Sequence, residues 1–181
     1  MDLSTQWKRL YALHSRTKHY LLIAEELCEE GDVFLQPLKE HRDAYDHIIR
    51  AQGAAFREDW SEDNRTAYAE KNMDKAYGHE YRAFFDTADW LSYICRRYIR
   101  RTLKAQKSKD LAAFEDYEKI KILVNDIPLK IAELREGKDI AIEPKGQKDL
   151  IKIGELAESY CTVLDSLIDA YILVHKRFDK I

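Results

Sequence analysis

The stretch KNMDKAYGHEYRAFFDTADWLSYICRRY, residues 71–98, carries the strongest pattern in the sequence. Its apolar side chains recur every three or four residues, which is the spacing of one face of an α-helix. Two such stripes run side by side, the first formed by Met73, Tyr77, Phe84, Ala88, Leu91, Cys95 and Tyr98 and the second by Ala76, His79, Ala83, Trp90 and Ile94. A helix with so wide an apolar surface is buried on two sides. The stretch therefore predicts the central helix of a bundle, or a helix that packs against a second copy of the chain.

Helical periodicity extends outward from this stretch in both directions. We expect helices over residues 4–30, 36–57, 66–107, 110–136 and 148–179. The second of them carries a stripe at 4-3-4-3-4 spacing, made of Leu38, Arg42, Tyr45, Ile49, Gln52 and Phe56. The sequence thus predicts one all-α domain over residues 1–181, an antiparallel bundle of four to five long helices.

Residues suited to helix ends set the expected boundaries. Ser4 is suited to cap the first helix and Gly31 to stop it, while Pro37 fits a first helical turn. Polar residues cluster in 58–70 and predict a break there. Pro128 predicts a kink or a division in the fourth helix, since proline cannot donate a backbone hydrogen bond.

Composition and cysteine spacing narrow the class of protein. The 181 residues are 45% hydrophobic and 35% charged but include only 6 Gly and 3 Pro, which excludes a turn-rich β-sandwich or barrel.

Cys28, Cys95 and Cys161 are odd in number and widely spaced, which favours buried, reduced thiols in a cytosolic protein. The first residues lack the apolar core of a signal peptide, and the longest apolar runs are too short to cross a membrane. We therefore expect a cytoplasmic protein without membrane contact.

The segment EHRDAYDHIIRA, residues 40–51, contains Arg42 and His47 with four residues between them, and the polar Asp43 follows the arginine. It resembles the HEPN superfamily, whose motif is Arg, four to six residues, then His, within a helical bundle. The resemblance implies metal-free RNA cleavage in a dimer cleft, as in toxins and nucleases of prokaryotic defence. In that role His47 would carry a proton at the reacting ribose, and Arg42 would hold the scissile phosphate.

A structural interpretation of Arg42 and His47 stays open beside the catalytic one. One helix presents them about 140° apart, because five residues at about 100° each make about 500°. A single copy therefore does not aim both at one point, whereas two copies across a two-fold axis could. In the alternative, Arg42 pairs with Asp46 or a neighbouring helix, and His47 is a polar residue at the boundary of the core. Whether the chain is an enzyme is not decided by these residues.

A second polar set is expected between the second and third helices. His79 and Asp86 are seven residues apart and so share one side of the third helix. Together with Arg42 and Asp43 they predict a buried polar cluster. Such a cluster would be a catalytic or ligand pocket, or an interhelical hydrogen-bond network that fixes the register of the helices.

Motifs for metals and cofactors are missing from the sequence. Bundles that hold two metal ions use Glu-x-x-His on two helices, but Ala44 and Ala76 stand three residues before His47 and His79. Asp43 and His47 could supply two ligands, which is too few for a site. The glycine-rich phosphate and dinucleotide motifs are absent as well. The sequence predicts neither a metal nor a cofactor.

The segment RRYIRRTLKAQKSK, residues 96–109, holds seven Lys and Arg residues and no acid, although the net charge of the chain is −3. Its cations lie along one helix end, namely Arg96, Arg97, Arg100, Arg101 and Lys104. They form either a ridge that follows the phosphates of a nucleic acid, with salt-sensitive binding, or a solvated helix end that can pair with the acidic residues 25–32.

Taken together, these patterns favour a non-enzymatic helical interaction or accessory module of a prokaryotic cytosolic system, with a link to defence implied by the HEPN resemblance. A HEPN-like, metal-independent ribonuclease and a nucleic-acid-binding helical adaptor are the alternatives. We expect the chain to form a homodimer or higher homo-oligomer through its second or third helix, because the apolar surface of the third exceeds what one neighbouring helix covers. A protein partner and a nucleic acid are further candidates for binding.

Overall fold

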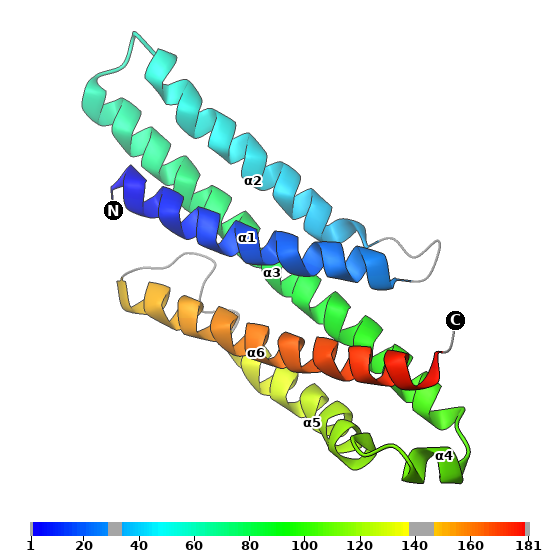
Figure 1. The fold of residues 1–181 in the computed structure, drawn as a ribbon. Helices are drawn as coiled ribbons and strands as arrows, with labels where there is room; N and C mark the ends of the chain where they lie inside the picture. Colours follow the sequence, from blue (N-terminus) through cyan, green and yellow to red (C-terminus); the bar gives the residue numbers. More distant parts are fainter. Residues whose placement is uncertain (1, 29–33, 138–146, 180–181) are drawn as a thin grey trace. The chain divides into compact units, whose positions relative to one another are not determined.

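A computed structural model describes residues 2–28, 34–137 and 147–179, with the backbone alone for 147–153. All regular elements in these ranges are helices, so the predicted all-α helical bundle is confirmed. In chain order the elements are α1 (Leu3–Leu27), α2 (Leu35–Gly53), the short 3₁₀ helix η1 (Ala54–Phe56), α3 (Glu62–Lys104), α4 (Ser108–Ala112), α5 (Tyr117–Glu136) and α6 (Gln147–Phe178) (Figure 1). None of the helices in the described ranges combines the length and the apolarity needed to cross a membrane.

The chain divides into two compact units, Met1–Trp90 and Leu91–Ile181, and the boundary falls inside α3. We call them unit 1 and unit 2. Unit 1 contains α1, α2, η1 and the first part of α3. Unit 2 contains the last part of α3 together with α4, α5 and α6.

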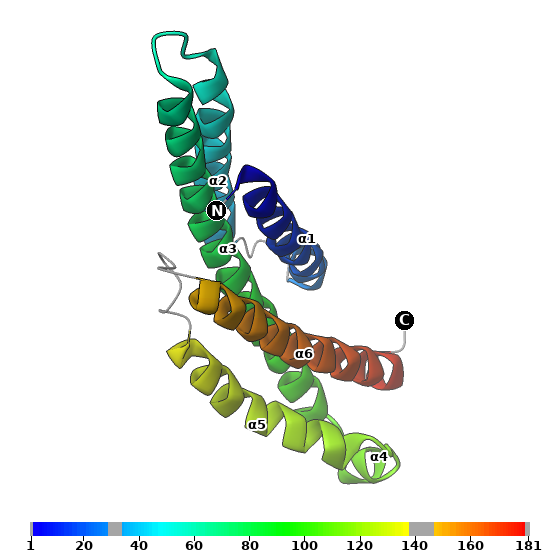
Figure 2. The ribbon, with the colours of Figure 1, turned by 90° about the vertical axis from the view of Figure 1, so that its left-hand side faces the viewer.

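In unit 1, α2 and the first part of α3 form an antiparallel hairpin, and α1 lies beside them (Figures 1 and 2). The large buried side chains come from α1 and α3, where the rings of Tyr20 and Phe84 meet edge to face with their centroids 6.5 Å apart. In contrast, α2 buries only Pro37, Ala44 and Ala51. These small residues recur every seven positions and so allow close approach of the neighbouring helices.

The large apolar residues of α2 lie on its outer side. Leu35, Leu38, Tyr45 and Ile49 are all exposed, and Phe56 in η1 continues their line with 82% of its surface exposed. The stripe expected on the second helix therefore exists, but it does not face the core of unit 1. The broad apolar surface of α3 is buried as predicted, and the chain's own helices contribute to its cover.

In unit 2, α5 and α6 run antiparallel beside the last part of α3 (Figures 1 and 2). The interior is apolar and draws on all three helices through Ile99, Ile120, Val124, Ile127, Ile131, Leu164, Leu167 and Val174. Cys95 is buried, as the sequence predicts, whereas Cys28 and Cys161 are only partly buried, and burial raises the pKa of the Cys95 thiol to about 12. A thiol with so high a pKa stays protonated near neutral pH and is a poor nucleophile.

Several helix ends differ from expectation. Asp2, rather than Ser4, caps α1, and its carboxylate accepts a 3.0 Å hydrogen bond from the backbone N–H of Thr5. Gly31 lies outside the described residues. The expected break after the second helix falls at residues 57–61, because α3 begins at Glu62.

The fourth helix is divided before Pro128 rather than at it. The division falls at residues 113–116, between α4 and α5, while Pro128 lies inside a continuous α5. At the break, the ring of Phe114 packs edge to face against Phe178 at the end of α6, with centroids 5.3 Å apart. This aromatic contact between distant segments is a tertiary effect that the local sequence pattern does not reveal.

Candidate functional site

Arg42, the first residue of the motif, lies on the outer side of α2. Its side chain is 74% exposed, and its Nε and Nη2 atoms donate to Oδ1 of Asp43 at 2.9 and 2.8 Å. Hydrogen bonding from the Arg42 guanidinium lowers the pKa of Asp43. The predicted pairing with Asp46 is not formed, since Asp46 bonds Arg50 at 2.8 Å. Arg42 is therefore engaged by its direct neighbour at the surface.

His47, the second residue of the motif, turns toward α3. Its Nδ1 lies 3.0 Å from Oδ1 of the buried Asn72, and Nδ2 of the same amide donates to the carbonyl oxygen of Tyr68 at 2.9 Å. Because the amide nitrogen is the donor in the second bond, Oδ1 must accept in the first. His47 Nδ1 therefore carries a proton. The ring also stacks on that of His79, with centroids 5.3 Å apart.

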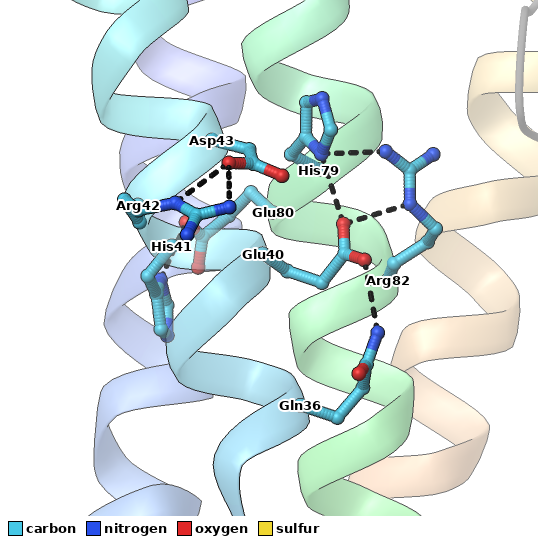
Figure 3. A network of polar contacts seen from close by, with 8 residues as sticks. All are labelled: Gln36, Glu40, His41, Arg42, Asp43, His79, Glu80 and Arg82. Carbon is cyan, nitrogen blue, oxygen red and sulfur yellow. Dashed lines mark hydrogen bonds and ion pairs between the residues drawn. The ribbon is translucent and has the colours of Figure 1, made fainter.

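His79 belongs to a network that crosses from α2 to α3, which we call the Glu40 network. Oε2 of Glu40 is 2.9 Å from His79 Nδ1 and accepts a 2.8 Å hydrogen bond from Arg82 Nε (Figure 3). Arg82 Nη2 also lies 2.6 Å from His79 Nδ1. This nitrogen can donate to the carboxylate or accept from the guanidinium, but one tautomer cannot do both. Burial acts to raise the pKa of Glu40, and the bonds from His79 and Arg82 lower it below its usual value.

Of the four residues expected in a buried cluster, Arg42 and Asp43 pair at the surface with side chains 74% and 40% exposed, while His79 belongs to the Glu40 network. Asp43, His47 and His79 lie near one another at the contact of α2 and α3, and both histidines contribute to the lowered pKa of Asp43. Asp86 lies half-buried on α3, two helical turns beyond His79. Three of these bonds join α2 to α3, namely His47 to Asn72, His79 to Glu40 and Arg82 to Glu40, so the arrangement links the two helices.

A second cluster joins three helices of unit 1, and we call it the His–Glu triad. It consists of His14 on α1, His41 on α2 and Glu80 on α3. Oε2 of Glu80 is 3.1 Å from Nδ1 of His41 and 3.3 Å from Nδ1 of His14. Glu80 is only 2% exposed, and its other oxygen, Oε1, is buried with no hydrogen-bond partner in the described part of the chain. Burial acts to raise the pKa of Glu80, but His41 and His14 outweigh it and lower the pKa.

Sequence reasoning missed this triad, although two signals point to it. The stripe on α3 steps from Tyr77 to Phe84 and omits the turn between them, where Glu80 stands at the expected position for a buried residue. His41 lies about 60° around α2 from the buried Ala44, at about 100° per residue, so it faces inward. No local sequence pattern shows that Glu80, His41 and His14 come together in the folded chain.

Two arginines of the basic segment donate hydrogen bonds to backbone carbonyl groups. Arg96 donates to the carbonyl oxygen of Ser92 at 3.1 Å, and Arg100 donates to that of Val124 on α5, also at 3.1 Å. Arg97, Arg101 and Lys104 are exposed. Within the predicted phosphate ridge, Arg100 therefore links α3 to α5 in unit 2.

We compared the chain with models of protein families, with curated proteins and with solved structures, and it matches none of them. The functions considered below therefore rest on the residues and contacts of this chain alone.

Proposed function

We propose that the chain is a non-enzymatic helical interaction module, an accessory protein of a prokaryotic cytosolic system, and that it associates with a second copy through α2. The observation that carries this proposal is the exposed apolar stripe of Leu35, Leu38, Tyr45 and Ile49. At about 100° per residue these four residues fall within an arc of about 80°. Scattered exposed apolar residues are ordinary, but an aligned set marks a surface that binds a partner.

The stripe is distinct from the face that α2 uses inside unit 1. The buried residues Pro37, Ala44 and Ala51 are centred about 135° away from it, at about 100° per residue. The core of unit 1 therefore does not need the large side chains of the stripe. Their removal should weaken association without weakening the fold.

A second copy suits this surface because the charges beside the stripe are mixed. Arg42 and Arg50 flank Asp43 and Asp46 along the same helix. Because the face carries cations and anions, a second α2 helix that lies antiparallel to it can place opposite charges near each other. A strongly basic or strongly acidic partner would instead meet charges of its own sign along the face. Two-fold pairing of one surface with itself is the commonest way in which chains associate.

The same geometry favours the interaction module over the ribonuclease. Arg42 lies within the arc of the exposed stripe, whereas His47 points about 140° away and bonds Asn72 on α3. A copy docked on the stripe would contact Arg42 and not His47. The motif residues are thus held in two different environments, and catalysis requires them to act at one phosphate.

Sedimentation equilibrium tests the proposal. We expect the parent chain to sediment above its monomer mass of 21.4 kDa, and Ile49→Glu to sediment as a monomer, because a carboxylate within the interface would be buried unpaired. Leu129→Glu is the matched control, since Leu129 is 70% exposed but lies on α5 in unit 2. It should leave the association unchanged. A parent chain of 21.4 kDa at high concentration, or equal effects of both variants, contradicts self-association through α2.

A further inference from the structure

The His–Glu triad has the composition of a metal site whose ligands come from three helices. Two imidazoles and one carboxylate are the ligand set of several zinc sites that keep a fourth position open for water. The three ligand atoms of His14, His41 and Glu80 lie within 4.8 Å of one another. We propose that this triad binds one divalent transition-metal ion of the zinc class. The Glu-x-x-His pattern is not needed here, because each ligand comes from a different helix.

The distances from Glu80 to both histidines are close to those around a bound ion. A tetrahedral ion with bonds of about 2.0–2.2 Å keeps its ligand atoms about 3.3–3.6 Å apart. The two Nδ1 atoms stand 3.1 and 3.3 Å from Oε2 of Glu80. These two distances need adjustments of only a few tenths of an ångström, and the nitrogens of His14 and His41, which lie within 4.8 Å of each other, come together by rotation of the half-exposed His14 side chain. The set of two nitrogens and one oxygen also favours zinc-like ions over calcium or magnesium, which prefer oxygen alone.

Burial of Glu80 supplies a second, independent reason. A buried carboxylate must be compensated, and its polar atoms normally all have partners. Oε1 of Glu80 has none in the described part of the chain. A cation at the triad would compensate the negative charge and place both oxygens next to a positive centre.

An ion can reach this site from solvent. Glu80 and His41 lie inside unit 1, but the side chain of His14 on α1 is 51% exposed. One side of the triad therefore faces water, which gives an ion a route to the site. Because the ligands come from α1, α2 and α3, the bound ion would link all three helices and raise the stability of unit 1.

Zinc titration of the chain without an affinity tag tests this proposal. We expect the parent to bind one Zn²⁺ per chain in isothermal titration calorimetry and to gain thermal stability when Zn²⁺ is added. His14→Ala and Glu80→Gln should each lower the affinity by about 100-fold or more, because loss of a ligand exceeds the 10–100-fold effect typical of outer-sphere partners. His19→Ala is the matched control, since His19 is an exposed histidine on α1 outside the triad. It should bind Zn²⁺ like the parent.

The outcome does not depend on a variant that fails to fold. His14 is half exposed, so His14→Ala should retain the helical circular dichroism of the parent even if Glu80→Gln does not. Absence of saturable Zn²⁺ binding by the parent overturns the proposal. So does binding that His14→Ala leaves intact, or that His19→Ala weakens as much as His14→Ala does, because surface histidines would then be responsible.

Discussion

The two units of the chain bury different kinds of side chain. Unit 1 encloses Glu80 and the Glu40 network between its helices, whereas Ser92 is the only polar residue in the buried set of unit 2 among the residues described. Unit 2 shows that helices of this length can be packed with an apolar interior. The charged groups of unit 1 are therefore not required by the helical architecture, and burying them costs free energy. The contrast indicates that unit 1 carries the site and unit 2 mainly supplies structure.

The substitution with the largest expected effect creates a cavity in the apolar interior of unit 2. Leu164→Ala removes a side chain with no exposed surface, and loss of a buried leucine typically costs about 2–5 kcal/mol through lost burial and the cavity left behind. We expect a loss in this range in the free energy of unfolding, measured by urea denaturation followed by circular dichroism. The zinc affinity of the triad should not change.

Leu173→Ala is the control for that cavity, because Leu173 lies on the same helix, α6, and is 38% exposed. It should cost much less, since water already reaches the side chain and a smaller area returns to it. Equal losses for the two variants would show that the interior of unit 2 is not the source of its stability.

The next largest expected effect is a difference in stability between variants of His47 and Arg42, the two residues of the motif in unit 1. His47→Ala removes the partner of the buried Asn72 amide, and an unsatisfied buried group costs about 1–3 kcal/mol. Arg42→Ala breaks only a surface ion pair with Asp43, which is worth about 0–1 kcal/mol. Thermal unfolding of both variants should therefore show a clear loss for His47→Ala and little change for Arg42→Ala. The opposite order would mean that Arg42, and not His47, supports the contact of α2 and α3.

An RNA cleavage assay on the same two variants tests the ribonuclease alternative. The interaction module predicts no cleavage of RNA by the parent in the presence of EDTA. If the parent cleaves RNA without a metal, and both variants lose this activity at an unchanged melting temperature, then Arg42 and His47 are catalytic and the proposed function is wrong. The two variants thus distinguish a structural from a catalytic motif by two separate measurements.

Much of the fold could be predicted from the sequence because helices follow local rules. The stripes on α3 have the period of a helix, and the positions of α1, α2, α3 and α6 follow from such stripes within a few residues. The division at residues 113–116 was not predicted, and the contact of Phe114 with Phe178 that accompanies it joins segments far apart in the sequence. The outward stripe of α2 shows the same limit, since periodicity identifies a face but not whether that face is inside.

The candidate site was predictable only in part, and for a similar reason. Asp43, His47 and His79 were singled out from sequence, and they do lie near one another. Glu80 was not singled out, because the sequence does not show whether a charged residue within an apolar stripe is buried or exposed. Its partners His14 and His41 are 66 and 39 positions away. Only the packing of three helices brings such residues together.

The smallest expected effect concerns the contacts of Asp179 with Tyr98 and His175 in unit 2. These polar side chains lie near the end of α6 rather than in the interior. Hydrogen bonding to the Tyr98 hydroxyl, and then to His175, lowers the pKa of Asp179, and the charge of Arg101 acts in the same direction. A carboxyl whose pKa is lower in the folded chain stabilises the fold above its unfolded pKa of about 3.9 and loses this effect as the pH falls through its folded pKa. Because the Asp179 side chain is 43% exposed, the gain in the free energy of unfolding is at most about 1 kcal/mol.

We expect Asp179→Asn to lower the melting temperature slightly at pH 7 and to match the parent near pH 2. The control is Asp126→Asn at an exposed position on α5, which should leave the melting temperature unchanged at both pH values. An equal difference at both pH values would show that the hydrogen bonds of Asp179, and not its charge, stabilise the end of α6.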